Sequence, residues 1–145
     1  MYCYYSRLLH HRAIYKYIHK QHHQWTAPIA IAAMYCHPVE HILSNLLPPA
    51  IGIQLFGPHI ATQWVWFALA LIQTLNDHSG YHIPNISTPE AHDYHHMKST
   101  QCFAGLGILD YIHGTDLQFR QSSYFKRRFR LSDFVSTKYF GKAKQ

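Results

Sequence analysis

The sequence predicts an all-α integral membrane protein, in which a transmembrane helical hairpin carries a helical domain rich in histidine. Hydrophobic residues make up 48% of the 145-residue chain and charged residues only 14%, a composition that excludes a disordered polypeptide. Between residues 21 and 76 the only charged side chain is Glu40, whereas lysines and arginines gather near both ends of the chain, as they do beside membrane spans. Fourteen histidines, several of them at helical spacings, are the third observation.

The first half of the chain is expected to form a helix followed by a hairpin. Apolar side chains recur near helical spacing over residues 1–24. Three apolar runs follow, at 27–36, 42–56 and 60–75. Because a crossing takes about 20 residues, the last two runs predict a hairpin that enters the bilayer near Ile42, turns at 56–58 and leaves by Asn76. The histidines before and after it would then share one face of the membrane. The alternative is a hydrophobic hairpin buried in a soluble domain.

The second half is expected to contain a loop, a helix and a tail. Two prolines indicate a loop at 83–89. A second histidine-bearing helix is predicted over 90–100, with Ser87 or Thr88 as its N-cap. The basic and aromatic residues of 117–145 predict a cytosolic tail that adsorbs to the membrane surface.

Two classes of protein are excluded by charge and cysteine content. The formal charge of +6 would by itself permit nucleic-acid binding, but a long uncharged centre with basic ends does not form the continuous basic face that this function needs. We therefore expect no nucleic-acid partner. The three cysteines form no CxxC pair, which argues against a disulfide scaffold and against a cysteine-based zinc ribbon.

The histidines form short boxes with metal-ligand spacing. HxxHH occurs at 19–23 and again at 92–96, and HxxxH occurs at 78–82. Positions i, i+3 and i+4 share one face of a helix, so each HxxHH box is expected to present three imidazoles toward one point. Imidazole suits iron, copper, nickel and zinc. A structural zinc ion takes four ligands, so nine histidines suit two ions close together. The predicted ligands are His10, His19, His22, His23, His78, His82, His92, His95 and His96.

Other polar residues near the boxes are candidates for supporting roles. The segment HPVEH places a glutamate between two histidines, and aspartates adjoin the later boxes. Carboxylates in such places hold the tautomer of a ligating histidine. These candidates are Glu40, Asp77, Asp93, His37 and His41. We interpret His11, His59 and His113 as structural or surface residues. A set of solvent-facing or core histidines without metal does not explain the repeated spacing.

Taken together, the motifs resemble a known family. The segments RLLHHRAIYKYIHKQHH, HPVEH, DHSGYHIP, HDYHH and LDYIHGTD extend over roughly residues 2–116. This combination resembles the fatty acid hydroxylase / sterol desaturase superfamily. The stretch WTAPIAIAAMYCHPVEHILSN is most similar to its branch of fatty acid hydroxylase domain-containing proteins, near the C4-methylsterol oxidases.

The resemblance implies an enzyme and its location. It implies a multi-pass protein of the endoplasmic reticulum membrane, with a domain at 1–116 whose histidine cage faces the cytosol and a basic tail at 117–145. The cage would hold two iron ions, which zinc can replace in preparations, and no catalytic residue beyond the metal centre is implied. The implied reaction uses O2 and electrons from NAD(P)H, delivered through cytochrome b5 and its reductase. The implied substrate is a lipid, with a sterol first, but hydroxylation and desaturation are not distinguished.

Two departures from the family pattern keep alternatives open. The first family box reads HxxxH, whereas Ser6 stands here four residues before His10. Family members also carry further transmembrane helices before this box, so we expect an N-terminally truncated domain. The main alternative is a non-catalytic homologue that acts as a membrane binding or regulatory protein. A histidine-rich metal transporter is a third possibility, but it would need several further spans.

Overall fold

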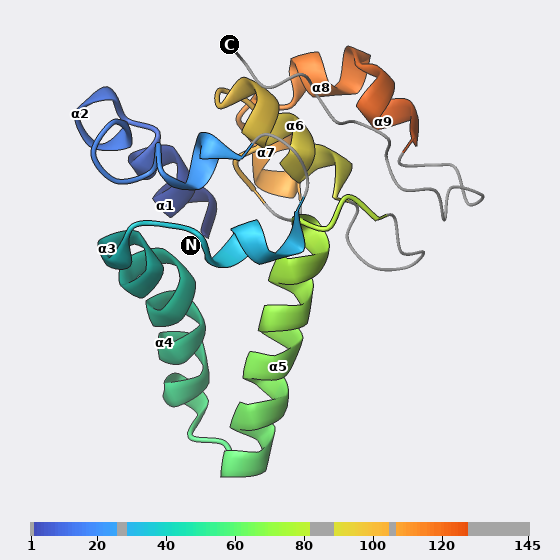
Figure 1. Ribbon diagram of the computed structural model, residues 1–145. Coiled ribbons are helices and arrows are strands. Elements are labelled where there is room, and N and C mark those ends of the chain that lie inside the picture. Colours follow the sequence, from blue (N-terminus) through green and yellow to red (C-terminus); the bar gives the residue numbers. More distant parts are fainter. Residues whose placement is uncertain (1, 26–28, 82–88, 105–106, 128–145) are drawn as a thin grey trace.

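The computed structural model describes residues 2–25, 29–81, 89–104 and 107–127, and every regular element among them is a helix. The all-α prediction is confirmed for this part of the chain. Figure 1 shows a long helical hairpin that projects from a cluster of short helices. The cluster contains the histidine boxes, and the hairpin joins the N-terminal boxes to the C-terminal ones.

The N-terminal segment is broken into three short helices instead of one. They are α1 (Tyr2–Leu9), α2 (Arg12–Tyr15) and the 3-10 helix η1 (His22–Gln24). His11 is extended, with φ −63° and ψ 137°, and its Nδ1 accepts a hydrogen bond from the amide of Ala13 at 3.4 Å. This cap ends one helix and starts the next. The prediction of a single helix was wrong, because the chain must turn back for His10 to reach His19.

A run of helical residues leads into the hairpin. After the 3-10 helix η2 (Ala30–Met34) come α3 (Pro38–Glu40), the π-helix η3 (His41–Leu46) and α4 (Leu47–Phe56), which follow one another without a gap. The side chain of His37 caps this run, because its Nδ1 accepts a hydrogen bond from the amide of Val39 at 3.2 Å. Prolines stand at the start of α3 and α4, where a missing amide hydrogen removes no helical hydrogen bond.

The turn of the hairpin lies where the sequence predicts it. Gly57 ends α4 in the left-handed conformation, with φ 53°, which glycine adopts without steric cost. His59 then caps α5 (Ile60–Asp77), with its Nδ1 accepting from the amide of Ala61 at 3.2 Å. The helices α4 and α5 contact each other.

The membrane crossing that was predicted for this hairpin is not confirmed. Among the helices of the described residues, none combines the length and the apolar character that a membrane span requires.

The C-terminal helices pack on one another around a small apolar cluster. They are α6 (Glu90–Lys98), α7 (Ile108–Ile112), α8 (Leu117–Gln121) and α9 (Ser123–Arg127). Tyr94 of α6, Cys102 and Phe119 of α8 form the cluster, and Phe119 is only 3% exposed. The start of the expected tail therefore packs on the histidine-bearing helix α6. The helix predicted over 90–100 is present as Glu90–Lys98, but the prediction of Ser87 or Thr88 as its N-cap was wrong, because Pro89 stands at that position. The other loop residues and 128–145 lie outside the described residues.

The interior of the described chain is unusually polar. Thirteen polar or charged residues are buried, against nine hydrophobic ones. Buried polar groups require partners, and six of these thirteen are histidines of the boxes. The buried core of this molecule is therefore the place to look for its chemistry.

Candidate metal centre

Eight of the nine predicted histidine ligands form two groups of four. Within each group, one ring nitrogen of every histidine lies within 4.8 Å of the others. We name the first group site A, which consists of His10, His19, His23 and His95. Site B consists of His22, His78, His92 and His96. The ninth predicted ligand, His82, lies outside the described residues.

Each HxxHH box divides its imidazoles between the two sites. The first box contributes its i and i+4 histidines to site A and its i+3 histidine, His22, to site B. The second box, on α6, contributes its i+3 histidine, His95, to site A and its i and i+4 histidines, His92 and His96, to site B. The expectation that each box points at one spot was wrong. On α6, residues three and four positions along are about 100° apart around the helix, and in the first box His19 lies in a turn before the 3-10 helix η1. Single histidines complete the sets: His10 completes site A and His78 completes site B.

The spacing of the ring nitrogens suits a bound cation. In site A, the Nε2 atom of His10 lies 3.0 Å from that of His95 and 3.1 Å from that of His19. In site B, the Nε2 atom of His78 lies 3.3 Å from that of His22 and 2.9 Å from that of His92. Metal–nitrogen bonds of about 2.0–2.1 Å separate ligand nitrogens by about 2.9 Å at right angles and about 3.3 Å in a tetrahedron. The residues present therefore fit a transition-metal ion in each site.

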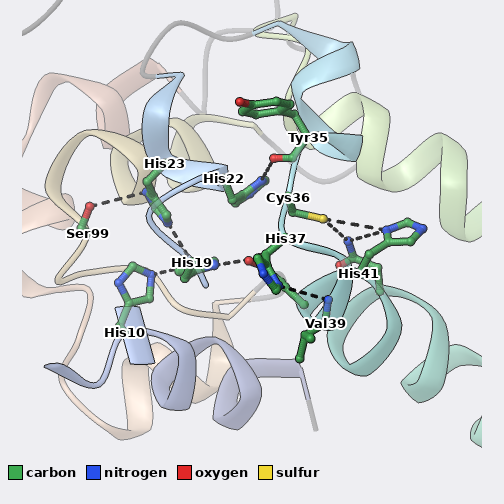
Figure 2. A network of polar contacts seen from close by, with 12 residues as sticks. His10, His19, His22, His23, Tyr35, Cys36, His37, Val39, His41 and Ser99 are labelled. Carbon is green, nitrogen blue, oxygen red and sulfur yellow. Dashed lines mark hydrogen bonds and ion pairs between the residues drawn. The ribbon is translucent and has the colours of Figure 1, made fainter. Parts of the chain in front are cut away.

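Contacts behind the rings orient the lone pairs toward these sites. The Nδ1 atom of His22 lies 3.3 Å from the backbone carbonyl oxygen of Tyr35. In the same way, Nδ1 of His78 lies 2.8 Å from the carbonyl oxygen of Thr74, and Nδ1 of His95 lies 2.8 Å from that of Gln101. A carbonyl oxygen can only accept, so Nδ1 carries the proton and Nε2 keeps its lone pair. Figure 2 shows the pairing of His22 with Tyr35. Several lone pairs that converge without a shared proton repel one another, and a cation removes that repulsion.

Burial favours the neutral form of seven of the cage imidazoles. Desolvation, followed by the repulsion of neighbouring histidines, lowers the pKa of His10 to about 2, that of His22 to about 3 and that of His95 to about 4. The pKa values of the remaining affected ligands, His23, His78, His92 and His96, are lowered in the same direction, with burial as the largest cause. A neutral imidazole is the form that binds metal.

The predicted supporting residues occupy different places. Glu40 is only 4% exposed and its Oε1 atom lies 2.7 Å from Nδ1 of His19. His41 contacts Asn45, at 3.4 Å between ring and amide nitrogens, and His37 is the helix cap already described. Asp77 accepts a hydrogen bond from Gln73, and Asp93 is half-buried on α6. His11, His59 and His113 are exposed.

Sequence reasoning missed the residues that brace the cage from behind. The ring of Phe103 lies edge-on to His10 and His95, with centroids 5.2 and 5.4 Å apart. Asp110, which is buried, accepts hydrogen bonds from the amides of Phe103 and Ala104 at 2.9 and 2.7 Å and from the hydroxyl of Thr115 at 2.6 Å. In the sequence, the sign of this role was Asp110, an acidic residue among apolar neighbours in the segment LDYIHGTD.

A cavity of about 610 Å³ opens beside both sites. Its lining includes His19 and His95 of site A, together with His22, His78 and His92 of site B. Hairpin residues line it as well, among them Ser44 and Gln73. Ser6 is buried on the same wall, one helical turn before His10. The cavity therefore gives a bound molecule access to both groups of histidines.

The comparisons with known proteins agree on one family. Residues 1–115 match the sequence model of the fatty acid hydroxylase family. Fatty acid hydroxylase domain-containing protein 2 from Homo sapiens is 50% identical over 133 residues, which cover 91% of this chain and 40% of that protein. Methylsterol monooxygenase 1 from Rattus norvegicus is 40% identical over 122 residues, covering 78% and 41%. A very-long-chain aldehyde decarbonylase from Oryza sativa subsp. japonica is 32% identical over 136 residues, covering 86% and 50%. The chain thus spans half or less of these relatives, and no solved structure matches it significantly.

Proposed function

Because this chain belongs to the fatty acid hydroxylase family, we propose that it carries the metal centre of a membrane-bound oxygenase that hydroxylates a lipid. One observation carries the proposal: two groups of four histidines lie together, and members of both groups line one cavity. Two iron ions held in sites A and B, or zinc in some preparations, are the proposed cofactors, with His82 as a ninth ligand. Iron bound there would supply the redox chemistry that activates O2 for attack on a C–H bond.

The protein's own residues would position this chemistry and shield it. The backbone carbonyls behind His22, His78 and His95 hold the Nε2 lone pairs toward the metal positions. Phe103 packs against His10 and His95 and excludes water from that side of site A. The cavity would accept the part of the lipid that reacts, and its mixed polar and apolar lining suits an aliphatic group near a polar centre.

The substrate is proposed to reach the cavity from a bilayer. On the hairpin, Leu55 is 78% exposed, Phe56 87% and Trp64 72%. Exposed apolar side chains on one element mark a contact with lipid or protein, and these support membrane association. We propose the endoplasmic reticulum membrane, a multi-pass arrangement and a cytosolic cage. A sterol is the first candidate substrate, because one relative is named a methylsterol monooxygenase. The aldehyde decarbonylase relative keeps fatty-chain substrates as the second candidate.

An acidic electron carrier is the proposed redox partner. Arg12, Lys16 and Lys20 are exposed, and no acidic residue occurs before Glu40. Tyr15 lies between Arg12 and Lys16 in the chain, and its ring stacks on that of His10 with centroids 5.3 Å apart. This basic surface lies at the end of the molecule opposite the hairpin turn (Figure 1), so a soluble domain could approach site A there. Cytochrome b5, reduced by its NAD(P)H-dependent reductase, is the candidate.

The decisive experiment measures metal and turnover together. The full chain, reconstituted in nanodiscs and loaded with ferrous iron without oxygen, should bind about two iron ions. Addition of O2, NADPH, cytochrome b5 and its reductase should then oxidise a 4-methylsterol, with a long-chain alkane or aldehyde lipid tested in parallel. A folded chain that binds no iron would overturn the oxygenase proposal.

One observation favours the non-catalytic alternative, and it can be tested directly. Ser6 is buried beside site A on the cavity wall, at the position where the family pattern has a histidine. If the wild-type chain binds iron but does not turn over, and Ser6→His gains oxidase activity, then this chain is a homologue that has lost a ligand. Ser44→His is the matched control, because it adds an imidazole to the same cavity from the hairpin.

A further inference from the structure

The two proposed metal sites differ in the charge of the groups that contact the Nδ1 atoms of their histidines. Site B is backed by the neutral carbonyl oxygens of Tyr35 and Thr74, on His22 and His78. Site A is backed by a carboxylate, because Nδ1 of His19 lies 2.7 Å from Oε1 of Glu40. Among the contacts of the eight described cage histidines, this is the only one with an acidic side chain.

Glu40 is placed so that its charge acts on site A. It is buried, and its second oxygen, Oε2, has no hydrogen-bond partner among the described residues. A buried carboxylate with one unsatisfied oxygen is costly unless a positive charge lies near it. Its contact with His19 also makes the imidazole a stronger electron donor at Nε2, since a carboxylate behind a histidine raises the basicity of the ligand.

We propose that Glu40 ranks the two sites, so that site A binds its metal ion first and holds the more positively charged ion of the pair. This inference rests on the metal binding proposed above. The first cation enters the site with the carboxylate behind it. The second cation enters site B against the repulsion of the first, with carbonyl dipoles behind two of its ligands, His22 and His78. In a pair of unequal oxidation state, the same charge difference places the oxidised ion in site A and the reduced ion in site B.

The test is a stepwise metal titration of the full chain. The metal-free protein in nanodiscs is titrated without oxygen with Co²⁺, whose visible absorption reports each occupied site. The wild type should show a tight step and a weaker step. His10→Ala should abolish the tight step and His78→Ala the weaker one. The opposite assignment, or two equal steps in the wild type, would overturn the proposal.

Glu40→Gln tests the cause of this order. The amide keeps an oxygen that can accept from His19, so the variant removes the charge with little change of shape. It should weaken the tight step by about 10–100-fold, the usual effect of losing such a partner, and leave the weaker step within about threefold. Glu40→Asp keeps the charge and should preserve the order of binding even if its shorter side chain weakens both steps.

A matched control separates this effect from the loss of any buried carboxylate. Asp116 is buried and forms an ion pair with Arg120 at 2.7 Å, away from the cage histidines. Asp116→Asn should leave both steps unchanged. If Glu40→Gln behaves like Asp116→Asn while two metal ions still bind, the ranking fails and the oxygenase proposal stands. If no metal binds to the folded wild type, both proposals fail.

A second readout follows the oxidation states. In iron-loaded protein reduced by one electron per chain, Mössbauer spectra should show one ferric and one ferrous ion. His78→Ala protein should retain the ion that is harder to reduce, and Glu40→Gln should make that ion easier to reduce. A purely structural role for Glu40 would lower the thermal stability without moving the reduction potential.

Discussion

The histidine cage and the helical hairpin place polar and apolar side chains in opposite ways. In the cage, His19, His23 and Glu40 are buried. On the hairpin, Leu55 and Phe56 are almost fully exposed. An ordinary soluble domain shows the reverse arrangement. The comparison teaches that the proposed function gives each region a different partner: a cation would stabilise the cage, and an apolar surrounding would stabilise the hairpin.

Both regions carry a free-energy cost, which comes from buried polar groups in the cage and from exposed apolar groups on the hairpin. Buried imidazoles lose hydration, which is costly unless their lone pairs find a partner. Exposed apolar surface costs about 25 cal/mol per Å² relative to burial. The proposed metal binding would relieve the first cost, and the proposed lipid contact would relieve the second. Variants that affect only one region should therefore change only one of these two associations.

The largest effect is expected from removing a ligand from the cage. His95→Ala takes one imidazole from site A and breaks the link between the second box and that site. The chain should bind about one metal ion instead of two, measured by elemental analysis, and any oxidase activity should fall to background. His59→Ala is the control, because His59 caps α5 outside the cage. Retention of two ions by His95→Ala would contradict the site as described.

The next largest effect is expected from a charge on the hairpin. Leu69 lies exposed in the middle of α5. A lysine at the centre of a bilayer-inserted helix costs about 2.5–3.5 kcal/mol, so Leu69→Lys should reduce flotation with phospholipid vesicles roughly a hundredfold and leave metal content unchanged. Tyr17→Lys, at an exposed site in the N-terminal segment outside the hairpin, should float like the wild type. Equal flotation of both variants would remove lipid as the partner of the hairpin.

A smaller effect is expected behind the cage. Asp110→Ala removes the acceptor for the amides of Phe103 and Ala104 and for the hydroxyl of Thr115. A hydrogen bond contributes a net of about 1 kcal/mol to stability, so the loss of these three should lower the free energy of unfolding by about 3 kcal/mol in denaturant titrations. Thr115→Ser keeps the donating hydroxyl and should change little. An unchanged stability for Asp110→Ala would show that the loop at 102–104 is held by other contacts.

The smallest effects come from two glycines of the hairpin. An alanine Cβ would meet nothing within 4 Å at either Gly52 or Gly57, so backbone conformation alone decides the outcome. Gly57 has φ 53°, and Gly57→Ala should destabilise the protein by about 1 kcal/mol. Gly52 lies inside α4, and Gly52→Ala should stabilise it by about 0.5–1 kcal/mol. The same sign for both variants would contradict the turn geometry.

Local features of the sequence predicted much of the fold. The turn at Gly57 and Pro58, the helix that carries the second box and the all-helical architecture follow from residue types and short spacings, which act within one or two turns of chain. The prediction of a single helix over 1–24 was wrong because it, too, used only short-range patterns. Its apolar spacing is helical, but a distant contact between His10 and His95 requires a break that no local pattern contains.

The sequence by itself determined the chemistry of the site: boxes of histidine at ligand spacing, in numbers that suit two ions. Only the tertiary structure decided how the histidines are shared, with each box divided between two sites, and which carboxylate supports them. Glu40 was one of several candidates until the fold placed it against His19, 21 residues away. The reason is geometric. Spacing along a helix determines where a side chain points relative to its own axis, but the packing of helices determines what it meets there.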